Sequence, residues 1–229
     1  MPHITAVVVA AGSGSRMGGV INKVFLPLCE RAVIDRTIEM IAKSDRIDDI
    51  VLVVRESDIL EAMEHIQCAK KRVRIIKGGK TRQESVYFGL LEAKNADYVV
   101  IHDGARALIT TDIIDKSIDE CIKYGACGVG VKCKDTLKTA DSNGFICATV
   151  DREKTYLIQT PQCFKYDDII SAHEGAIEEG FEATDDCMLY ERYVGNVKLV
   201  EGSYENIKLT TPEDMIVAER ILNRRSESK

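Results

Sequence analysis

The sequence has no long apolar segment. No run approaches the about 18 consecutive apolar residues that a membrane-spanning helix requires, although 45% of the 229 residues are hydrophobic. The opening residues, Met1-Pro2-His3-Ile4, contain neither the basic region nor the small-residue cleavage site of a secretory signal. We therefore expect a cytoplasmic protein with no membrane partner.

Paired cysteines are also missing. Eight cysteines stand at positions 29, 68, 121, 127, 133, 147, 163 and 187, yet none forms a Cys-x-x-Cys pair or has a histidine at zinc-finger spacing. This pattern argues against a zinc site and favours reduced thiols over disulfides.

The sequence also lacks a surplus of positive charge. The chain carries 31 Lys and Arg residues against 37 Asp and Glu residues, which gives a net charge of −6. Because nucleic-acid binding depends on a surplus of basic residues on one face, we expect no nucleic-acid partner. Internal repeats, low-complexity stretches and linkers are absent as well, so we expect a single domain over residues 1–229.

Short β-branched runs alternate with helical patterns along the chain, which is typical of βαβ units and a mainly parallel sheet. The pattern predicts strands at residues 4–10, 50–54, 73–76, 98–101, 129–132 and 197–200. It predicts helices that include residues 34–41, 56–67, 86–93, 114–122, 166–179 and 184–192, and a last helix opened by Thr211-Pro212.

Residues 133–150 interrupt this alternation. Two short β-prone segments flank Asp141-Ser142-Asn143-Gly144, which is a strong hairpin turn. The hairpin carries too little apolar surface to pack well alone. We therefore expect it to lean on another subunit.

The first predicted strand runs into a glycine-rich loop. Small residues there let the main chain approach a ligand closely and turn its N–H groups toward anionic oxygens; they are Ala10, Ala11, Gly12 and Gly14. Arg16 adds a planar fork of donors, and Lys23 adds a mobile point charge. This combination suits a polyphosphate, although a plain turn with solvated charges is the alternative for such a loop taken alone.

Two common phosphate loops do not fit this segment. A Walker A loop ends in Gly-Lys-Ser/Thr, whereas this loop has Gly14-Ser15-Arg16. A dinucleotide fingerprint needs a third glycine where Met17 stands, and an acidic residue after the second strand where Arg55 stands.

Further polar residues follow the apolar strands, where ligands of an open α/β sheet gather. Asp103 follows the strand at 98–101 and could hold Mg²⁺, which takes one or two carboxylates and completes its shell with phosphate and water; a turn cap is the alternative. His102 is expected to be structural. Lys208 follows Glu205-Asn206-Ile207 and adds a third cation, unless it is merely solvated.

A second glycine turn, Gly78-Gly79, precedes Arg82-Gln83-Glu84-Ser85 at a predicted helix start. Main-chain groups at such a turn can read the edge of a base, and an ordinary capped helix is the alternative.

Taken together, these features resemble one family. The motifs that carry the resemblance are Ala10 to Met17, Lys23, Gly78-Gly79, Arg82 to Val86, His102 to Arg106, Asp135-Thr136, Thr149 to Arg152, Gln159-Thr160-Pro161-Gln162, Ala183-Thr184-Asp185 and Asn206-Ile207-Lys208. In this order they are similar to the motifs of the 2-C-methyl-D-erythritol 4-phosphate cytidylyltransferase family, from the first strand to the last helix.

The resemblance implies a nucleotide-diphospho-sugar transferase-like fold: an α/β three-layer sandwich, Rossmann-like, with a mainly parallel mixed sheet. Residues 133–153 would form a protruding β-hairpin arm that joins a homodimer. The substrates would be CTP and 2-C-methyl-D-erythritol 4-phosphate, and the cofactor would be Mg²⁺ or another divalent cation.

The resemblance also implies roles for individual residues. Arg16, Lys23 and Lys208 would be catalytic, and CTP would lie along the first loop, with Gly79 and Ser85 near the cytosine. Asp103 would lie beside the ribose and Mg²⁺. The remaining substrate-binding residues would be Arg106, Thr136, Thr160 and Thr184, with Arg152 reaching in from the arm of the partner.

The chain departs from the family pattern at Val24, Lys80 and Ala107, which affects loop geometry more than chemistry. Ribitol 5-phosphate cytidylyltransferase is an alternative function, because its family shares the loop and the Gln-Thr-Pro-Gln motif but less of Val150-Asp151-Arg152. A non-catalytic nucleotide-binding module is the alternative from another class, which the full set of cations disfavours.

Overall fold

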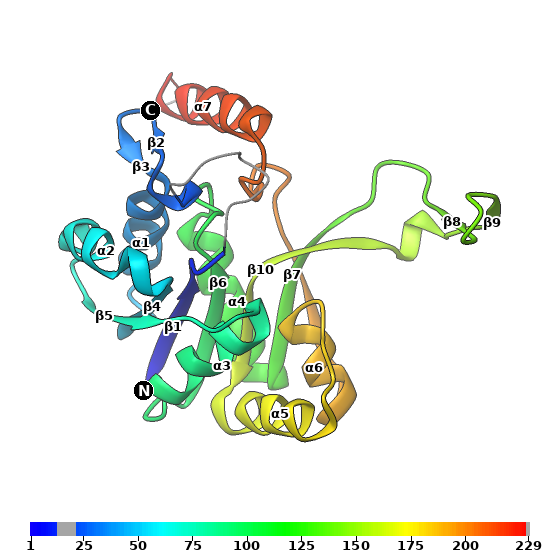
Figure 1. Ribbon diagram of the computed structural model, residues 1–229, viewed down its shortest axis with the longest axis horizontal. Helices are drawn as coiled ribbons and strands as arrows, with labels where there is room; N and C mark the ends of the chain where they lie inside the picture. Colours follow the sequence, from blue (N-terminus) through cyan, green and yellow to red (C-terminus); the bar gives the residue numbers. More distant parts are fainter. Residues whose placement is uncertain (13–21, 228–229) are drawn as a thin grey trace.

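A seven-stranded sheet forms the centre of the computed structural model, which describes residues 1–12 and 22–227 (Figure 1). Its strands lie in the order β11-β7-β10-β6-β1-β4-β5. Their bounds are β1 Ile4–Val9, β4 Asp49–Val54, β5 Arg72–Lys77, β6 Tyr98–Asp103, β7 Ala126–Lys132, β10 Tyr156–Lys165 and β11 Lys198–Glu201. All neighbours pair in parallel except β10, which is antiparallel to both β6 and β7.

Helices cover both faces of this sheet, which confirms the predicted α/β sandwich with a mainly parallel mixed sheet. One face packs against α1 (Val33–Lys43), α2 (Ile59–His65) and α4 (Thr111–Tyr124). The other packs against α3 (Arg82–Glu92), α5 (Tyr166–Glu179) and α6 (Asp186–Tyr193). None of the described helices is both long and apolar enough to cross a bilayer.

Apolar spacing accounts for these helices. Ile34, Ile38 and Ile41 recur at helical intervals and are fully buried on α1. The helix predicted over 56–67 is a shorter α2 between two single turns, η3 (Glu56–Asp58) and η4 (Ile66–Cys68). Near the C-terminus, α7 (Pro212–Glu227) shares a small core with Leu28 of the hairpin β2 (Pro27–Leu28) and β3 (Arg31–Ala32).

The sequence pattern missed β10. This strand contains the polar residues Gln159, Thr160 and Gln162 together with Pro161, and proline is rare inside sheets because it cannot donate to a ladder. The pairing with β7 shifts register between Ile158 and Gln162. This irregularity accommodates the proline inside a strand whose middle is buried.

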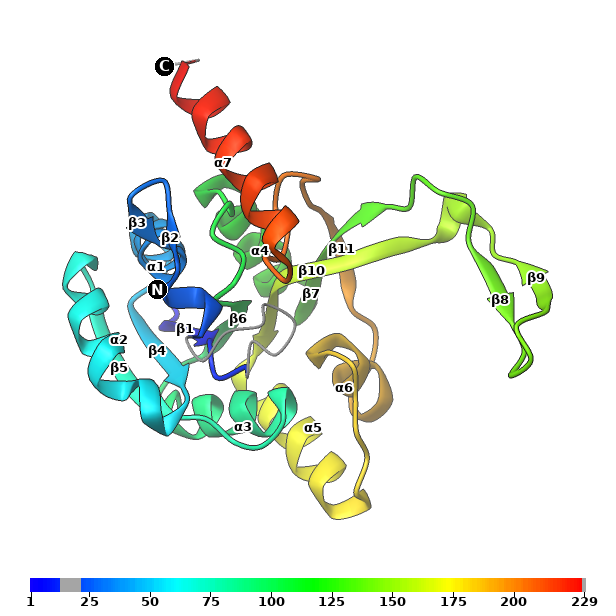
Figure 2. The ribbon, with the colours of Figure 1, turned by 45° about the horizontal axis from the view of Figure 1, so that its top comes forward.

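The segment after β7 projects away from the sheet (Figures 1 and 2). It carries β8 (Lys138–Ala140) and β9 (Ile146–Thr149), which pair around Gly144, and the single turn η5 (Arg152–Lys154). The hairpin predicted at Asp141-Ser142-Asn143-Gly144 is therefore present. Every residue of β8 and β9 is exposed, so the hairpin contributes no core of its own.

Candidate functional site

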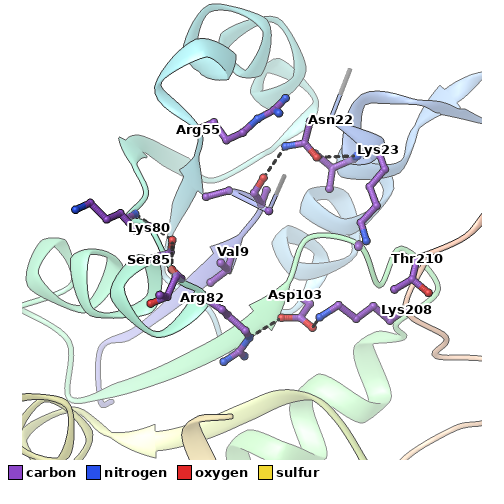
Figure 3. Close-up of a pocket in the computed structure, with 17 residues that line it drawn as sticks. Val9, Asn22, Lys23, Arg55, Lys80, Arg82, Ser85, Asp103, Lys208 and Thr210 are labelled. Carbon is purple, nitrogen blue, oxygen red and sulfur yellow. Dashed lines mark hydrogen bonds and ion pairs between the residues drawn. The ribbon is translucent and has the colours of Figure 1, made fainter. Parts of the chain in front are cut away.

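A pocket of about 520 Å³ opens at the carboxyl edge of the parallel strands (Figure 3). Its described lining comes from four separate stretches of chain, within 9–12 at the end of β1, 22–24 around η2 (Lys23–Phe25), 79–85 at the start of α3, and 103–105 at the end of β6, together with Arg55, Lys208 and Thr210. Polar residues that sequence reasoning placed at strand ends thus meet at one edge, as the topology of an open sheet requires.

The first predicted loop contributes directly to this pocket. Ala10, Ala11 and Gly12 line it, and Lys23 faces it from η2. Gly14 and Arg16 lie outside the described residues, so their placement stays a prediction. The described flanks of the loop therefore bring a small-residue strand end and a cation to the same cavity.

The second glycine turn packs tightly against the first. A side chain on Gly78 would lie 2.5 Å from the Cβ atom of Ala11 and 2.9 Å from the Ser85 hydroxyl, so only glycine fits. The Ser85 hydroxyl donates to the Thr81 carbonyl at 2.8 Å and accepts from the Gly79 amide at 3.0 Å. The amide of Gly79 is thus used inside the protein, and Gly79 and Ser85 line the pocket as a pre-formed wall.

Asp103 stands at the centre of a charged cluster on the pocket floor. The Lys208 ammonium lies 2.6 Å from one of its carboxylate oxygens, and Arg82 Nε lies 3.2 Å from the other (Figure 3). Burial opposes ionisation of this carboxyl, but the charges of Arg82, Lys208 and Arg106 outweigh burial and hold the pKa of Asp103 well below its ordinary value. These cations therefore favour the ionised form of Asp103.

Arg82 joins this cluster to a second buried carboxylate. Its guanidinium donates at 2.9 Å to Asp186, which is fully buried and also contacts His173 Nε2 at 3.2 Å. Attraction to both carboxylates outweighs burial and raises the pKa of Arg82. Sequence reasoning quoted Arg82 in a motif without giving it a role, because its partner Asp186 is 104 residues away.

Thr160 and Arg106 lie beneath the pocket floor rather than in its lining. The Thr160 hydroxyl accepts from the Asp103 amide at 3.0 Å and lies 3.1 Å from His102 Nδ1. Arg106 donates to the Asn206 carbonyl at 2.7 Å. Burial lowers the pKa of His102 to about 4, so this imidazole is neutral near pH 7, in keeping with its expected structural role.

Three predicted substrate residues lie elsewhere in the chain's own fold. Thr136 and Arg152 are exposed on the arm, which extends away from the central sheet (Figure 2). Thr184 is exposed beside a different depression, which is also lined by Tyr156 and Met188. All three assignments stay predictions, as does the expectation that Arg152 acts in the site of a partner subunit.

The lining also contains polar residues that sequence reasoning did not select. These are Asn22, Arg55, Lys80, Thr81, Arg82 and Thr210. Asn22 is 1% exposed and hydrogen-bonded to the residues around it, whereas in the sequence it is only the neighbour of a lysine.

Among the described lining residues, Asp103 supplies the one carboxylate that could bind a divalent cation. Within residues 1–12 and 22–227, no three His, Cys, Asp or Glu side chains gather closely enough to hold a metal ion by themselves. A lone carboxylate fits Mg²⁺ that arrives with phosphate ligands, because this ion keeps several waters and shares its shell with substrate oxygens. The donor set therefore suits a metal brought by a nucleotide.

Comparisons with known proteins agree with this geometry. The model of the 2-C-methyl-D-erythritol 4-phosphate cytidylyltransferase family matches residues 4–224. The chain belongs to this family. The resemblance drawn from the sequence motifs is thereby confirmed.

Individual relatives cover nearly the whole chain. The 2-C-methyl-D-erythritol 4-phosphate cytidylyltransferase of Clostridium acetobutylicum is 44% identical over 224 residues, covering 96% of this chain and 98% of that protein. The enzyme of the same name from Desulforamulus reducens is 44% identical over 230 residues, covering 99% and 98%. Among solved structures, the 4-diphosphocytidyl-2C-methyl-D-erythritol synthase of Anaerococcus prevotii is 33% identical, with a TM-score of 0.87 and coverage of 97% and 96%.

Proposed function

We propose that this protein transfers the cytidylyl group of CTP to 2-C-methyl-D-erythritol 4-phosphate, giving 4-diphosphocytidyl-2-C-methyl-D-erythritol and pyrophosphate in isoprenoid biosynthesis. One observation carries the proposal: five segments that match the family motifs, around Ala10, Lys23, Gly79, Asp103 and Lys208, line the same pocket.

The chemistry requires charge neutralisation rather than a base. A phosphate oxygen of the acceptor attacks the α-phosphorus of CTP in line, the bond from that phosphorus to the β-phosphate breaks, and pyrophosphate leaves. A phosphate monoester is already anionic near pH 7, so the nucleophile needs no general base. The barrier comes from bringing two polyanions together, and preorganised cations lower it.

Different cations neutralise different phosphate groups in this reaction. Lys23 and Arg16 serve the leaving pyrophosphate, and Lys208 serves the α-phosphate. Arg82 holds Asp103 from the opposite side from Lys208, which fixes the direction in which the carboxylate faces. Mg²⁺ bound by Asp103 and phosphate oxygens would supply further neutralisation of the triphosphate.

The acceptor site is completed by a second subunit in this proposal. The exposed arm, residues 133–153, forms the contact of a homodimer and carries Thr136 and Arg152 to the sugar phosphate of the partner. Exposed Phe145 and Ile146 support this role, because the arm buries neither side chain in its own chain. Arg106, Thr160 and Thr184 serve the same acceptor, and Gly79 with Ser85 serves the cytosine.

Pyrophosphate release with CTP and Mg²⁺ tests the proposal directly. We expect release with 2-C-methyl-D-erythritol 4-phosphate and none with ribitol 5-phosphate. Release with ribitol 5-phosphate alone would replace the acceptor, and CTP binding without any release would favour a binding module. The family match does not favour either alternative.

A further inference from the structure

Asn22 connects three separate parts of the pocket wall. Its side-chain nitrogen donates to the Ala10 carbonyl at 2.7 Å and to a carboxylate oxygen of Asp58 at 2.9 Å. Its side-chain oxygen caps η2 by accepting from the Val24 amide at 3.4 Å. Asn22 therefore joins the end of β1, the last residue of η3, which also precedes α2, and the single turn that carries Lys23.

An amide is the side chain that satisfies this arrangement. The Ala10 carbonyl and the Asp58 carboxylate accept hydrogen bonds but cannot donate, so both require donors, and the Val24 amide requires an acceptor. Asparagine supplies two N–H bonds from one atom and an acceptor from the other. An aspartate of the same shape would place an anion against two acceptors.

The network continues to a second cation of the pocket. Asp58 is 4% exposed and receives Arg55 through two hydrogen bonds, from Nε at 2.6 Å and from Nη2 at 2.9 Å. Burial opposes ionisation of Asp58, but hydrogen bonds from Arg55, Asn22 and Ser57 outweigh it and keep the pKa of this carboxyl below its ordinary value. Asp58 therefore stays an anion that orients both Asn22 and Arg55.

We infer that Asn22, oriented by Asp58 and Arg55, is a positioning residue for the reaction: it fixes the turn that carries Lys23 at a set distance from the strand end that lines the nucleotide site. The inference rests on the proposed function. Asn22 itself is saturated by protein groups and does not need to contact the nucleotide. Its effect passes through Lys23, which directly follows it, and through Ala10.

Asn22→Asp is the decisive variant, because it keeps the shape and removes the donor. Loss of these buried hydrogen bonds should displace the Lys23 turn and weaken the binding of CTP by about tenfold or more. We expect the KM for CTP and the calorimetric dissociation constant of CTP to rise by about that factor, with a lower kcat and an unchanged KM for the acceptor. Asp58→Asn, which keeps one acceptor, should give a smaller shift in the same direction.

Thr5→Val is the matched control. Thr5 is also buried and donates to a carboxylate, Asp49, at 2.7 Å. It lies near the amino end of β1, whereas the pocket lies at the carboxyl end. It should lower thermal stability without changing either KM. This contrast separates positioning from a general loss of stability.

The outcomes are distinct for the inference and for the function. If wild-type protein is inactive with CTP and 2-C-methyl-D-erythritol 4-phosphate, the proposed function is wrong, and the calorimetric comparison decides the inference. If the dissociation constant of CTP is the same for wild type, Asn22→Asp and Asp58→Asn, the inference is wrong. An acceptor KM that rises together with the CTP KM would also overturn it.

Discussion

The pocket and the arm differ in how their polar groups are satisfied. In the pocket, Asp103 contacts Lys208 at 2.6 Å and Arg82 at 3.2 Å within one chain. On the arm, the Arg152 side chain is 57% exposed and lies 3.7 Å from the carboxylate of the adjacent Glu153. The charges of the pocket are therefore organised within one chain before any ligand arrives, whereas the arginine of the arm is left largely exposed to solvent.

Removing Arg82 should produce the largest loss on the pocket side. Arg82→Met leaves the fully buried Asp186 without its cation, and a broken buried pair costs about 3–5 kcal/mol in the free energy of unfolding. Urea denaturation measures this loss. Arg192→Met, which breaks an exposed pair with Glu179, should cost at most about 1 kcal/mol. Equal losses would contradict the contrast between buried and exposed charge.

Removing Lys23 should affect chemistry more than folding. Lys23→Ala deletes a preorganised cation from the pocket, so we expect turnover to fall by about 10²–10³. The free energy of unfolding should change little. Lys77→Ala, on a lysine that is not part of the pocket lining, should keep wild-type turnover. An active Lys23→Ala enzyme would remove this lysine from the mechanism.

On the arm, Arg152→Ala should act on one substrate only. Loss of a charge-assisted hydrogen bond to a phosphate should raise the KM for 2-C-methyl-D-erythritol 4-phosphate by about tenfold or more. The KM for CTP should stay the same, and Lys154→Ala serves as the neighbouring control. A change in CTP affinity alone would show that the arm is wrongly assigned to the acceptor.

The buried histidine should make folding sensitive to pH. An unfolded histidine protonates near pH 6.5, whereas the pKa of buried His102 is about 4. Between these values the unfolded state binds more protons, so stability should fall as pH is lowered, by at most about 1.4 kcal/mol per pH unit. The free energy of unfolding, measured by denaturation at several pH values, should fall more steeply with decreasing pH for wild type than for His102→Gln. Equal pH dependence of the two proteins would refute the idea.

The smallest effect on folding should come from the tip of the arm. Phe145 is 71% exposed, so Phe145→Ser should change the free energy of unfolding of the monomer by less than about 0.5 kcal/mol. Self-association, measured by sedimentation at several concentrations, should nevertheless weaken. A variant that associates as tightly as wild type would exclude Phe145 from the interface.

The sequence predicted most of the sheet, because its parallel strands and amphipathic helices carry strong periodic patterns. Strand β10 was not predicted, because its buried polar residues have partners that local spacing cannot reveal. Gln159 donates to the Ser203 carbonyl at 2.9 Å, and Gln162 donates to Asp185 at 2.9 Å. Without these contacts the segment reads as a loop.

The same limit applies to the pocket. Asp103 was found because it follows an apolar strand, which is a local signal. Lys208 was selected on the same ground, although it lies in the loop between β11 and α7 rather than at the end of a strand. Asn22 and Arg82 were not selected, because their roles come from Asp58, which lies 36 residues away, and from Asp186, which lies 104 residues away. Long-range pairing of charges is therefore the part of the site that spacing does not predict.

The reversed direction of β10 determines which parts of the arm can change. Because β10 runs against its neighbours, it begins at the edge where they end, and it continues directly from the arm to Thr160. Inserting residues in pairs near Gly144 would lengthen the hairpin and leave this strand undisturbed. A shift of β10 by a single residue would turn Thr160 to the opposite face of the sheet and away from the Asp103 amide. The length of the arm can therefore vary, whereas the register of β10, into which the arm continues, cannot.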